Sequence, residues 1–129
     1  MRLTTDKPDG NFETALNMFY AKDGTTWVRG GGPAPDYQDV ELNEWIRSIV
    51  KKLGADIEVD GVSDEELNMT MAEITIFDGL EDIDGLIAML YNAAWAFSEL
   101  NARLMDYEDS GLTPEEVKEL KFRMEGLDK

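Results

Sequence analysis

The 129-residue sequence contains no cysteine and no histidine. Without cysteine, the chain has neither disulfides nor thiolate chemistry. Without histidine, it lacks the commonest general base and metal ligand, and any Ser-His or Cys-His nucleophile pair. We therefore expect a protein that is not an enzyme and that uses no metal and no cofactor.

Lysine and arginine are missing from the fifty residues between Lys52 and Arg103. The whole chain has 28 acidic and 12 basic side chains, which gives a formal charge of −16. Residues 55–112 alone hold fifteen acids and one base, so −14 of this charge lies there. Such an imbalance concerns partners and solubility rather than fold. It predicts a basic partner and argues against direct binding of nucleic acid.

The sequence also lacks a long apolar run. The longest nearly uncharged stretch, Gly85 to Ser98, is too short to span a bilayer, and the first six residues have no apolar signal-peptide region. An acid-rich surface is also repelled by anionic lipid headgroups. We expect no membrane association and a cytoplasmic location.

Hydrophobic residues make up 43% of the chain, which is enough for a folded core. We predict one α+β domain over residues 1–129, with a small N-terminal hairpin and helix, one or two further strands, and a C-terminal antiparallel helical hairpin. The expected parts are a hairpin and glycine loop at 1–37, a helix at 38–54, an acidic strand and turn segment at 55–79, and the helical hairpin at 80–129.

Near the N-terminus, Phe12 and Leu16 indicate a short helix, and Asp23-Gly24 is a strong hairpin dipeptide. The run Gly30 to Pro35 predicts a loop, because its glycines and prolines cannot hold regular structure. No lysine or serine follows it in the pattern of a phosphate-binding P-loop, which favours a plain flexible connector. Apolar residues from Val40 to Leu53 recur every three or four positions and predict an amphipathic helix.

The middle of the chain gives weaker signals. Ile57 and Val59 suggest a short extended piece, and Ser63 with Glu66 forms a capping box that opens a helical turn. In residues 71–77 the side chains alternate in a way typical of a strand.

The C-terminal part has the clearest periodicity. Apolar residues follow an unbroken heptad pattern from Ile83 to Tyr107, and Thr113-Pro114 starts a second helix. A short loop between the two predicts an antiparallel pair. The heptad residues are expected to form core or a homo-oligomer contact; they are Ile83, Leu86, Leu90, Phe97, Leu100 and Leu104.

Two candidate sites built on carboxylates are disfavoured because each lacks a residue that its chemistry needs. Residues 56–61 match the start of an EF-hand calcium loop, but position 12 is Leu67 rather than the bidentate glutamate that completes the shell. Residues 78–84 hold four acids, yet no histidine or lysine lies nearby to complete a proton-transfer pair. Acids at this place suit the N-terminus of the helix that follows.

A folded acidic surface remains as the candidate functional site. Ten acids with no interleaved cation could occupy a protein groove built for phosphates; they are Asp56, Glu58, Asp60, Asp64, Glu65, Glu66, Asp78, Glu81, Asp82 and Asp84. The same acids could serve solubility alone. A small-ligand pocket near Trp27 and Tyr37, which flank the glycine loop, is another hypothesis.

The segment Tyr107-Glu108-Asp109-Ser110-Gly111-Leu112-Thr113-Pro114-Glu115-Glu116 resembles the "YEDTGLTPEE" tail shared by many small prophage proteins of Gram-positive gut bacteria. The opening Arg2 to Pro8 and the stretch Tyr20 to Gly24 are similar to such proteins as well. The resemblance implies a phage origin and supplies no catalytic residues.

Small acidic phage proteins include inhibitors of host defence, such as anti-CRISPR proteins that occupy the nucleic-acid groove of a Cas nuclease. The hypothesis is therefore an acidic inhibitor of a basic, nucleic-acid-binding host protein, with a CRISPR–Cas effector first among the candidates. The alternatives are a sponge for nucleotide signals and an oligomerising accessory protein.

Overall fold

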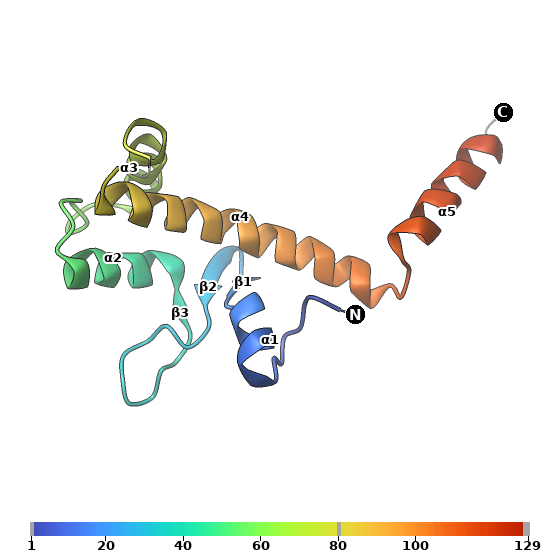
Figure 1. Ribbon diagram of the computed structural model, residues 1–129, viewed down its shortest axis with the longest axis horizontal. Coiled ribbons are helices and arrows are strands. Elements are labelled where there is room, and N and C mark those ends of the chain that lie inside the picture. Colours follow the sequence, from blue (N-terminus) through green and yellow to red (C-terminus); the bar gives the residue numbers. More distant parts are fainter. Residues whose placement is uncertain (1, 80, 128–129) are drawn as a thin grey trace.

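A computed structural model describes residues 2–79 and 81–127 of the chain, and shows an α+β fold (Figure 1). Within these residues, the chain forms five helices and a three-stranded antiparallel sheet of order β1-β2-β3. In chain order the elements are α1 (Gly10–Leu16), β1 (Phe19–Lys22), β2 (Thr25–Val28), β3 (Val40–Glu41), α2 (Leu42–Leu53), α3 (Asp64–Phe77), α4 (Ile83–Asp109) and α5 (Pro114–Leu127). The predicted fold class is confirmed.

The predicted hairpin is formed by β1 and β2. Asp23 and Gly24 both have positive φ, 53° and 77°, as the two central residues of a type I′ turn require. The register pairs Phe19 with Val28 and Lys22 with Thr25. The two-residue strand β3 then pairs with β2 on its other side.

The helix predicted from Val40 begins two residues later, at Leu42 in α2. Val40 lies in β3 opposite Val28, because pairing with β2 holds its backbone extended. The C-terminal end of α2 is as expected, since Gly54 takes the left-handed conformation that ends many helices.

The strand predicted at 71–77 is wrong, and these residues form the second half of α3. The helix starts where Ser63 Oγ accepts a hydrogen bond from the Glu66 backbone, as the capping box indicates. It continues because Leu67 and Met71, one turn apart, are both fully buried. The extended piece expected at 57–62 belongs to no strand, although Ile57 and Val59 are buried.

The 27-residue helix α4 runs along the body of the molecule as far as the start of the link to α5, with α3 on one side and α2 and the sheet on the other (Figure 1). Its first turn comes close to the end of α3: a Cβ at Gly85 would lie 1.8 Å from the carbonyl oxygen of Gly79. No side chain fits there, so glycine is required.

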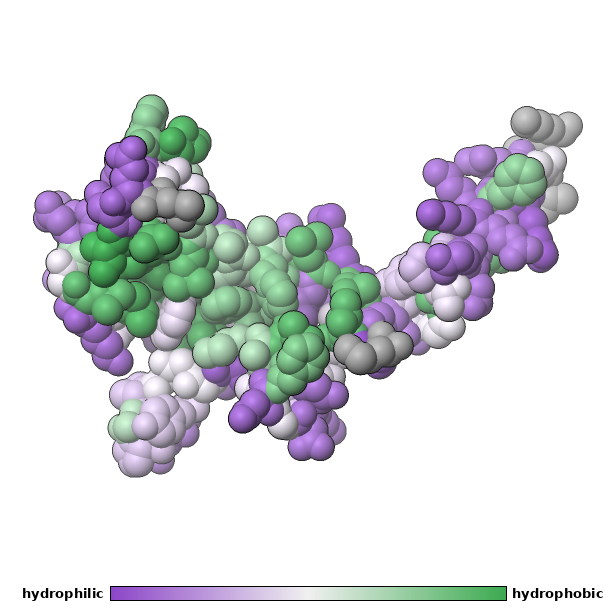
Figure 2. Space-filling model, in the orientation of Figure 1, coloured by the Kyte–Doolittle hydropathy of each residue, from purple (hydrophilic) through white to green (hydrophobic). Residues whose placement is uncertain are grey.

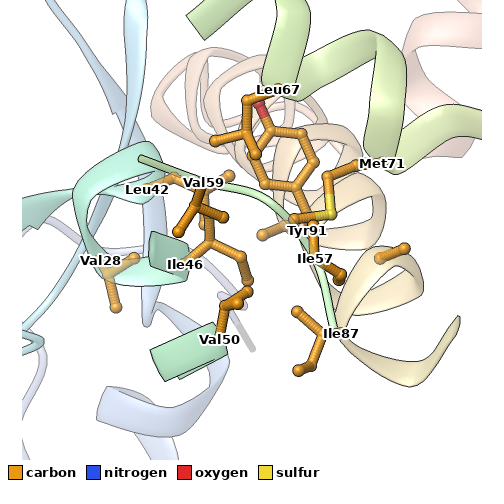
Figure 3. Packing of buried hydrophobic residues seen from close by; sticks show 12 residues of the cluster. Val28, Leu42, Ile46, Val50, Ile57, Val59, Leu67, Met71, Ile87 and Tyr91 are labelled. Atoms are coloured by element: carbon orange, nitrogen blue, oxygen red, sulfur yellow. The ribbon is translucent and has the colours of Figure 1, made fainter. Parts of the chain in front are cut away.

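The core lies where α2, α3, α4 and residues 55–62 meet (Figure 3). Tyr91 of α4 is fully buried, and its ring lies beside Leu67 and Met71 of α3 (Figure 3). Ile46 and Val50 of α2 close the cluster from the opposite side.

The two C-terminal helices and the short loop between them are as predicted, but they do not pack as an antiparallel pair. Helix α5 projects away from the end of α4 (Figure 1). In residues 114–126 only Val117 is half-buried and every other residue is exposed. The heptad spacing had predicted contact between the helices, whereas the backbone at the loop directs α5 outward.

Candidate functional site

The ten predicted acids lie at the end of the molecule formed by α2, α3 and the start of α4 (Figure 1). Residues 55–66 lead from the end of α2 back along this helix, so that Asp60 meets Lys51 and Asp64 meets Arg47. Asp78, Glu81, Asp82 and Asp84 lie where α3 ends and α4 begins. We call this surface the acidic end. Asp56, Glu58 and Asp60 point outward in alternation with the buried Ile57 and Val59. The core thus orients the three carboxylates toward solvent even though no strand forms.

Three further acids, Asp64, Glu65 and Glu66, make the first turn of α3. Carboxylates are stabilised at a helix N-terminus by the backbone dipole, which explains why three adjacent acids are tolerated there. All three are exposed.

The remaining four acids surround the start of α4. Asp82 caps this helix, since its Oδ1 accepts a hydrogen bond from the Gly85 backbone at 2.9 Å. Asp84 Oδ1 accepts one from the backbone of Asp56 at 3.0 Å. This bond joins the two acidic stretches, which are 28 positions apart, into one surface. Asp78 and Asp84 are half-buried, whereas Glu81 and Asp82 are exposed.

Two of the ten acids are ion-paired with α2. Asp64 lies 2.9 Å from the Arg47 guanidinium, and Asp60 lies 2.7 Å from Lys51 Nζ. The Asn43 amide and the Arg47 guanidinium hold the pKa of Asp64 below its ordinary value. In the part of the chain that the structure describes, the other eight acids have no cation within 4.0 Å. Their negative charge is therefore available to a partner.

Arg47 also fixes the backbone of the acidic end. Its guanidinium donates to the carbonyl oxygens of Val59 and Val62 at 3.3 and 3.0 Å. One arginine therefore holds both ends of a four-residue turn and the first residue of α3.

Among residues 2–79 and 81–127, no group of three or more carboxylates is arranged to hold a metal ion. The carboxylates of the EF-hand-like stretch do not converge: Lys51 holds Asp60, while Glu58 is exposed to solvent. Nor is any described helix both long enough and apolar enough to cross a membrane.

The six heptad residues, which we call the apolar stripe, are not the core of the molecule. Leu104 is half-buried, and the other five are exposed on one side of α4; they are Ile83, Leu86, Leu90, Phe97 and Leu100. The face that packs inward instead carries Gly85, Ile87, Ala88, Tyr91, Ala94, Ser98 and Asn101. Small residues on this face let α2, α3 and the sheet approach the helix closely.

The two aromatic residues proposed for a small-ligand pocket do not form one: Trp27 packs against Lys22, and Tyr37 is exposed to solvent. The Trp27 ring lies under Lys22 Nζ at 5.3 Å, and its Nε1 donates to the Lys22 carbonyl oxygen. Tyr37 is exposed in the loop that projects from the sheet. Neither residue lines the hollows of about 400 and 380 Å³ that adjoin the N-terminal segment and the sheet.

A polar cluster that the sequence did not indicate lies beside this loop. The Tyr20 hydroxyl donates to Asp39, and the Arg29 guanidinium lies over the Tyr20 ring at 4.6 Å. Burial and the bond to Asp39 raise the pKa of Tyr20 to about 12. The Gly30 backbone also donates to Asp39, so the cluster anchors the loop to the sheet.

A second feature without a sequence signal is the attachment of the N-terminal segment to α4. The Glu108 carboxylate accepts hydrogen bonds from the backbones of Leu3 and Thr4, at 2.7 and 2.9 Å, and from the Thr4 hydroxyl. Burial alone would raise the pKa of Glu108, but these bonds and the nearby Arg2 hold it below its ordinary value.

Comparison of the chain with models of protein families, with curated proteins and with solved structures found no match. The geometry of the described residues therefore carries the functional argument.

Proposed function

We propose that the chain is a phage-encoded inhibitor whose acidic end binds a basic, nucleic-acid-binding host protein and keeps nucleic acid out of its groove. A CRISPR–Cas effector is the first candidate for this partner. The observation that carries the proposal is the joining of two acidic stretches into one surface through Asp84 and the Asp56 backbone.

Charge would act in two ways at such a surface. Eight carboxylates without ion-pair partners create a field that steers a positively charged groove toward the acidic end. Like charges held this close repel one another and cost stability, and among the described residues cations offset this repulsion at only two of the ten acids. Because the attraction is electrostatic, added salt is expected to weaken it.

The test compares two variants with equal net charge. Glu58, Glu65, Glu66 and Glu81 are exposed acids of the acidic end that form no ion pair with residues 2–79 or 81–127. Changing all four to lysine shifts the formal charge by +8, from −16 to −8. The control changes four exposed acids elsewhere by the same amount; they are Asp36, Glu99, Asp106 and Glu115.

Each protein serves as bait in a nuclease-treated lysate of a Gram-positive bacterium, at about 50 and about 300 mM salt. We expect the wild type and the control to retain the same basic protein at low salt and to lose it at high salt. The purified captured protein is then bound to a labelled DNA duplex, and displacement of the duplex is followed by fluorescence anisotropy.

The wild type and the control should displace the duplex, while the acidic-end variant should do so about tenfold less well or worse. Equal displacement by the acidic-end variant would show that total charge, rather than this surface, is responsible. Capture without any displacement would rule out competition with nucleic acid.

A further inference from the structure

Two helix faces of this chain are apolar and uncovered. On α4, the apolar stripe extends along the helix, and Phe97 and Leu100 are 37% and 64% exposed. On α5, Leu120 and Met124 lie one turn apart and are 45% and 66% exposed. On the face seen in Figure 2, hydrophobic residues run from the end at α3 along α4 to the N-terminal segment. Uncovered faces of this kind mark contact surfaces.

The stripe becomes a groove at its C-terminal half. A hollow of about 200 Å³ lies between α4 and the N-terminal part of the chain; it is lined by Leu3, Thr4, Leu16, Phe97, Leu100, Asn101 and Leu104. Most of these residues are apolar. The bonds from Leu3 and Thr4 to Glu108 hold the outer wall in place. A hollow of this size accepts one or two aliphatic side chains of a helix laid across it.

The apolar face of α5 could fill this groove, but residues 110–113, which join α5 to α4, direct the helix away from it. Gly111 takes φ +76°, and Ser110 Oγ bonds to the Tyr107 carbonyl oxygen and to the Leu112 backbone. The Thr113 hydroxyl then accepts a hydrogen bond from the Glu116 backbone and donates one to the Glu116 carboxylate. These bonds direct α5 away from the body, so a return onto its own α4 would have to break them.

Charge and size favour the α5 helix of a second copy of the chain as the segment that fills the groove. Residues 114–127 carry four acids and three bases, a net −1, so the other residues carry −15 of the total −16. Two acidic bodies repel each other, whereas a nearly neutral helix can approach the stripe.

The length of α5 also matches the length of the apolar segment on α4. Fourteen residues of α5 extend about 21 Å, which is also the distance along α4 from Leu90 to Leu104. The contact would cover the exposed parts of the groove side chains and of the two α5 side chains; they are Leu3, Phe97, Leu100, Leu120 and Met124. At about 200 Å² for a fully accessible large side chain, two symmetric contacts would bury about 1,000 Å² of apolar surface. This area is near the lower limit of specific interfaces.

We propose that two copies of the chain associate by exchanging α5, each helix lying with Leu120 and Met124 in the groove of the other copy beside Phe97 and Leu100. The contact is symmetric, as in most homodimers. It leaves the acidic end of each copy at the far end of α4, so this inference does not depend on the proposed function.

The first test measures mass by light scattering after gel filtration of the full chain, from about 1 to about 200 μM, a range suited to a micromolar complex. We expect the mass to rise from 14.5 kDa toward twice that value. Leu120→Asp with Met124→Asp, or Leu100→Asp alone, should keep the mass at that of one chain. Phe122→Asp is the matched control, because Phe122 is 76% exposed on the opposite side of α5.

All of these substitutions are at exposed positions, and circular dichroism checks that the helices persist. A single chain at every concentration would overturn the proposal. So would a dimer that Leu120→Asp with Met124→Asp leaves intact, because the copies would then meet through another surface.

A cross-link separates exchange from folding back within one chain. Since the chain has no cysteine, Leu100→Cys with Met124→Cys introduces the only two thiols. A short bismaleimide should join two copies, giving a band at twice 14.5 kDa on a denaturing gel. A cross-linked product of one chain only would show that α5 folds onto its own groove, and would refute the exchange.

Discussion

The assignment of residues 71–77 to a helix can be tested by comparing two side chains. Met71 is fully buried and Phe77 is 81% exposed. The two are six residues apart, so a strand would place both on the same face. In a helix they lie about 120° apart around the axis, and only Met71 reaches the core. Truncating each residue to alanine should therefore cost similar amounts of stability if the segment is a strand, and very different amounts if it is a helix.

For Met71→Ala we expect a loss of about 3 kcal/mol in the free energy of unfolding, within the range of about 2–5 kcal/mol for truncating a buried methionine. Three heavy atoms leave a site between Leu67 and Tyr91, where neighbouring helices can close the space only in part. Phe77→Ala removes a larger side chain but little buried surface. Its effect should stay within about 0.5 kcal/mol, helped by the higher helix propensity of alanine.

The assay is urea unfolding followed by tryptophan fluorescence and by far-UV circular dichroism, whose coincidence tests two-state behaviour. At an m-value of about 1.5 kcal/mol/M, Met71→Ala should lower the midpoint by about 2 M. Met71→Leu serves as the control and should lose less than about 1.5 kcal/mol, because it nearly conserves volume. Equal losses for Met71→Ala and Phe77→Ala, or a larger loss for Phe77→Ala, would refute the helix.

Three further predictions concern charge and capping. The stabilising effect of Glu108 is present above its ordinary pKa and is lost as pH falls through its lowered folded-state pKa. In urea titrations the wild type should therefore exceed Glu108→Gln in stability at neutral pH, and this difference should shrink as the pH falls below the ordinary pKa of the carboxyl group; a difference that grows on acidification would contradict the prediction. Asp82→Ala should cost about 1 kcal/mol, measured as a lower melting temperature, because the Gly85 backbone loses its cap; an unchanged melting temperature would contradict the cap. Raising salt from about 10 to about 300 mM should raise the urea midpoint, since it screens repulsion within a chain of charge −16; a lower midpoint would contradict this.

Elements that carry their own start and stop signals were predictable from the sequence. Asp23-Gly24 specifies the hairpin, Gly54 ends α2, and Ser63 starts α3. The second half of α3 was not predictable by the same means, because Ile74 and Ile76 are β-branched and favour strands locally. Burial of Met71 against Tyr91 of α4 overrides that preference, and no local pattern reports a contact twenty residues away.

The orientation of α4 was predicted incorrectly for a different reason. The helix carries two series at spacings of three and four, one of large apolar residues such as Leu90 and Leu100, and one of smaller residues such as Ala88 and Ala94. Hydrophobicity alone favours the first series as the core. Close packing of α3 and the sheet requires the second, and only the positions of the neighbouring elements decide between them.

At the candidate site, sequence position predicted where the acids are but not which of them are neutralised. Asp60 and Asp64 find cations on α2 because residues 55–62 fold back along that helix. The pairing depends on the path of the chain, and nothing in the local sequence distinguishes Asp60 from Glu58.

The three contacts of Arg47 bear on the entropy of any binding event at the acidic end. A loop that becomes ordered only when it meets a partner loses about 1–2 kcal/mol of backbone entropy for each residue fixed. Here one planar guanidinium already holds the carbonyl oxygens of Val59 and Val62 and the Asp64 carboxylate. Lysine cannot reproduce this forked geometry. The backbone that carries Glu58, Asp60 and Asp64 is thus held in place before binding, and a partner would meet these carboxylates without the ordering penalty of a flexible acidic loop.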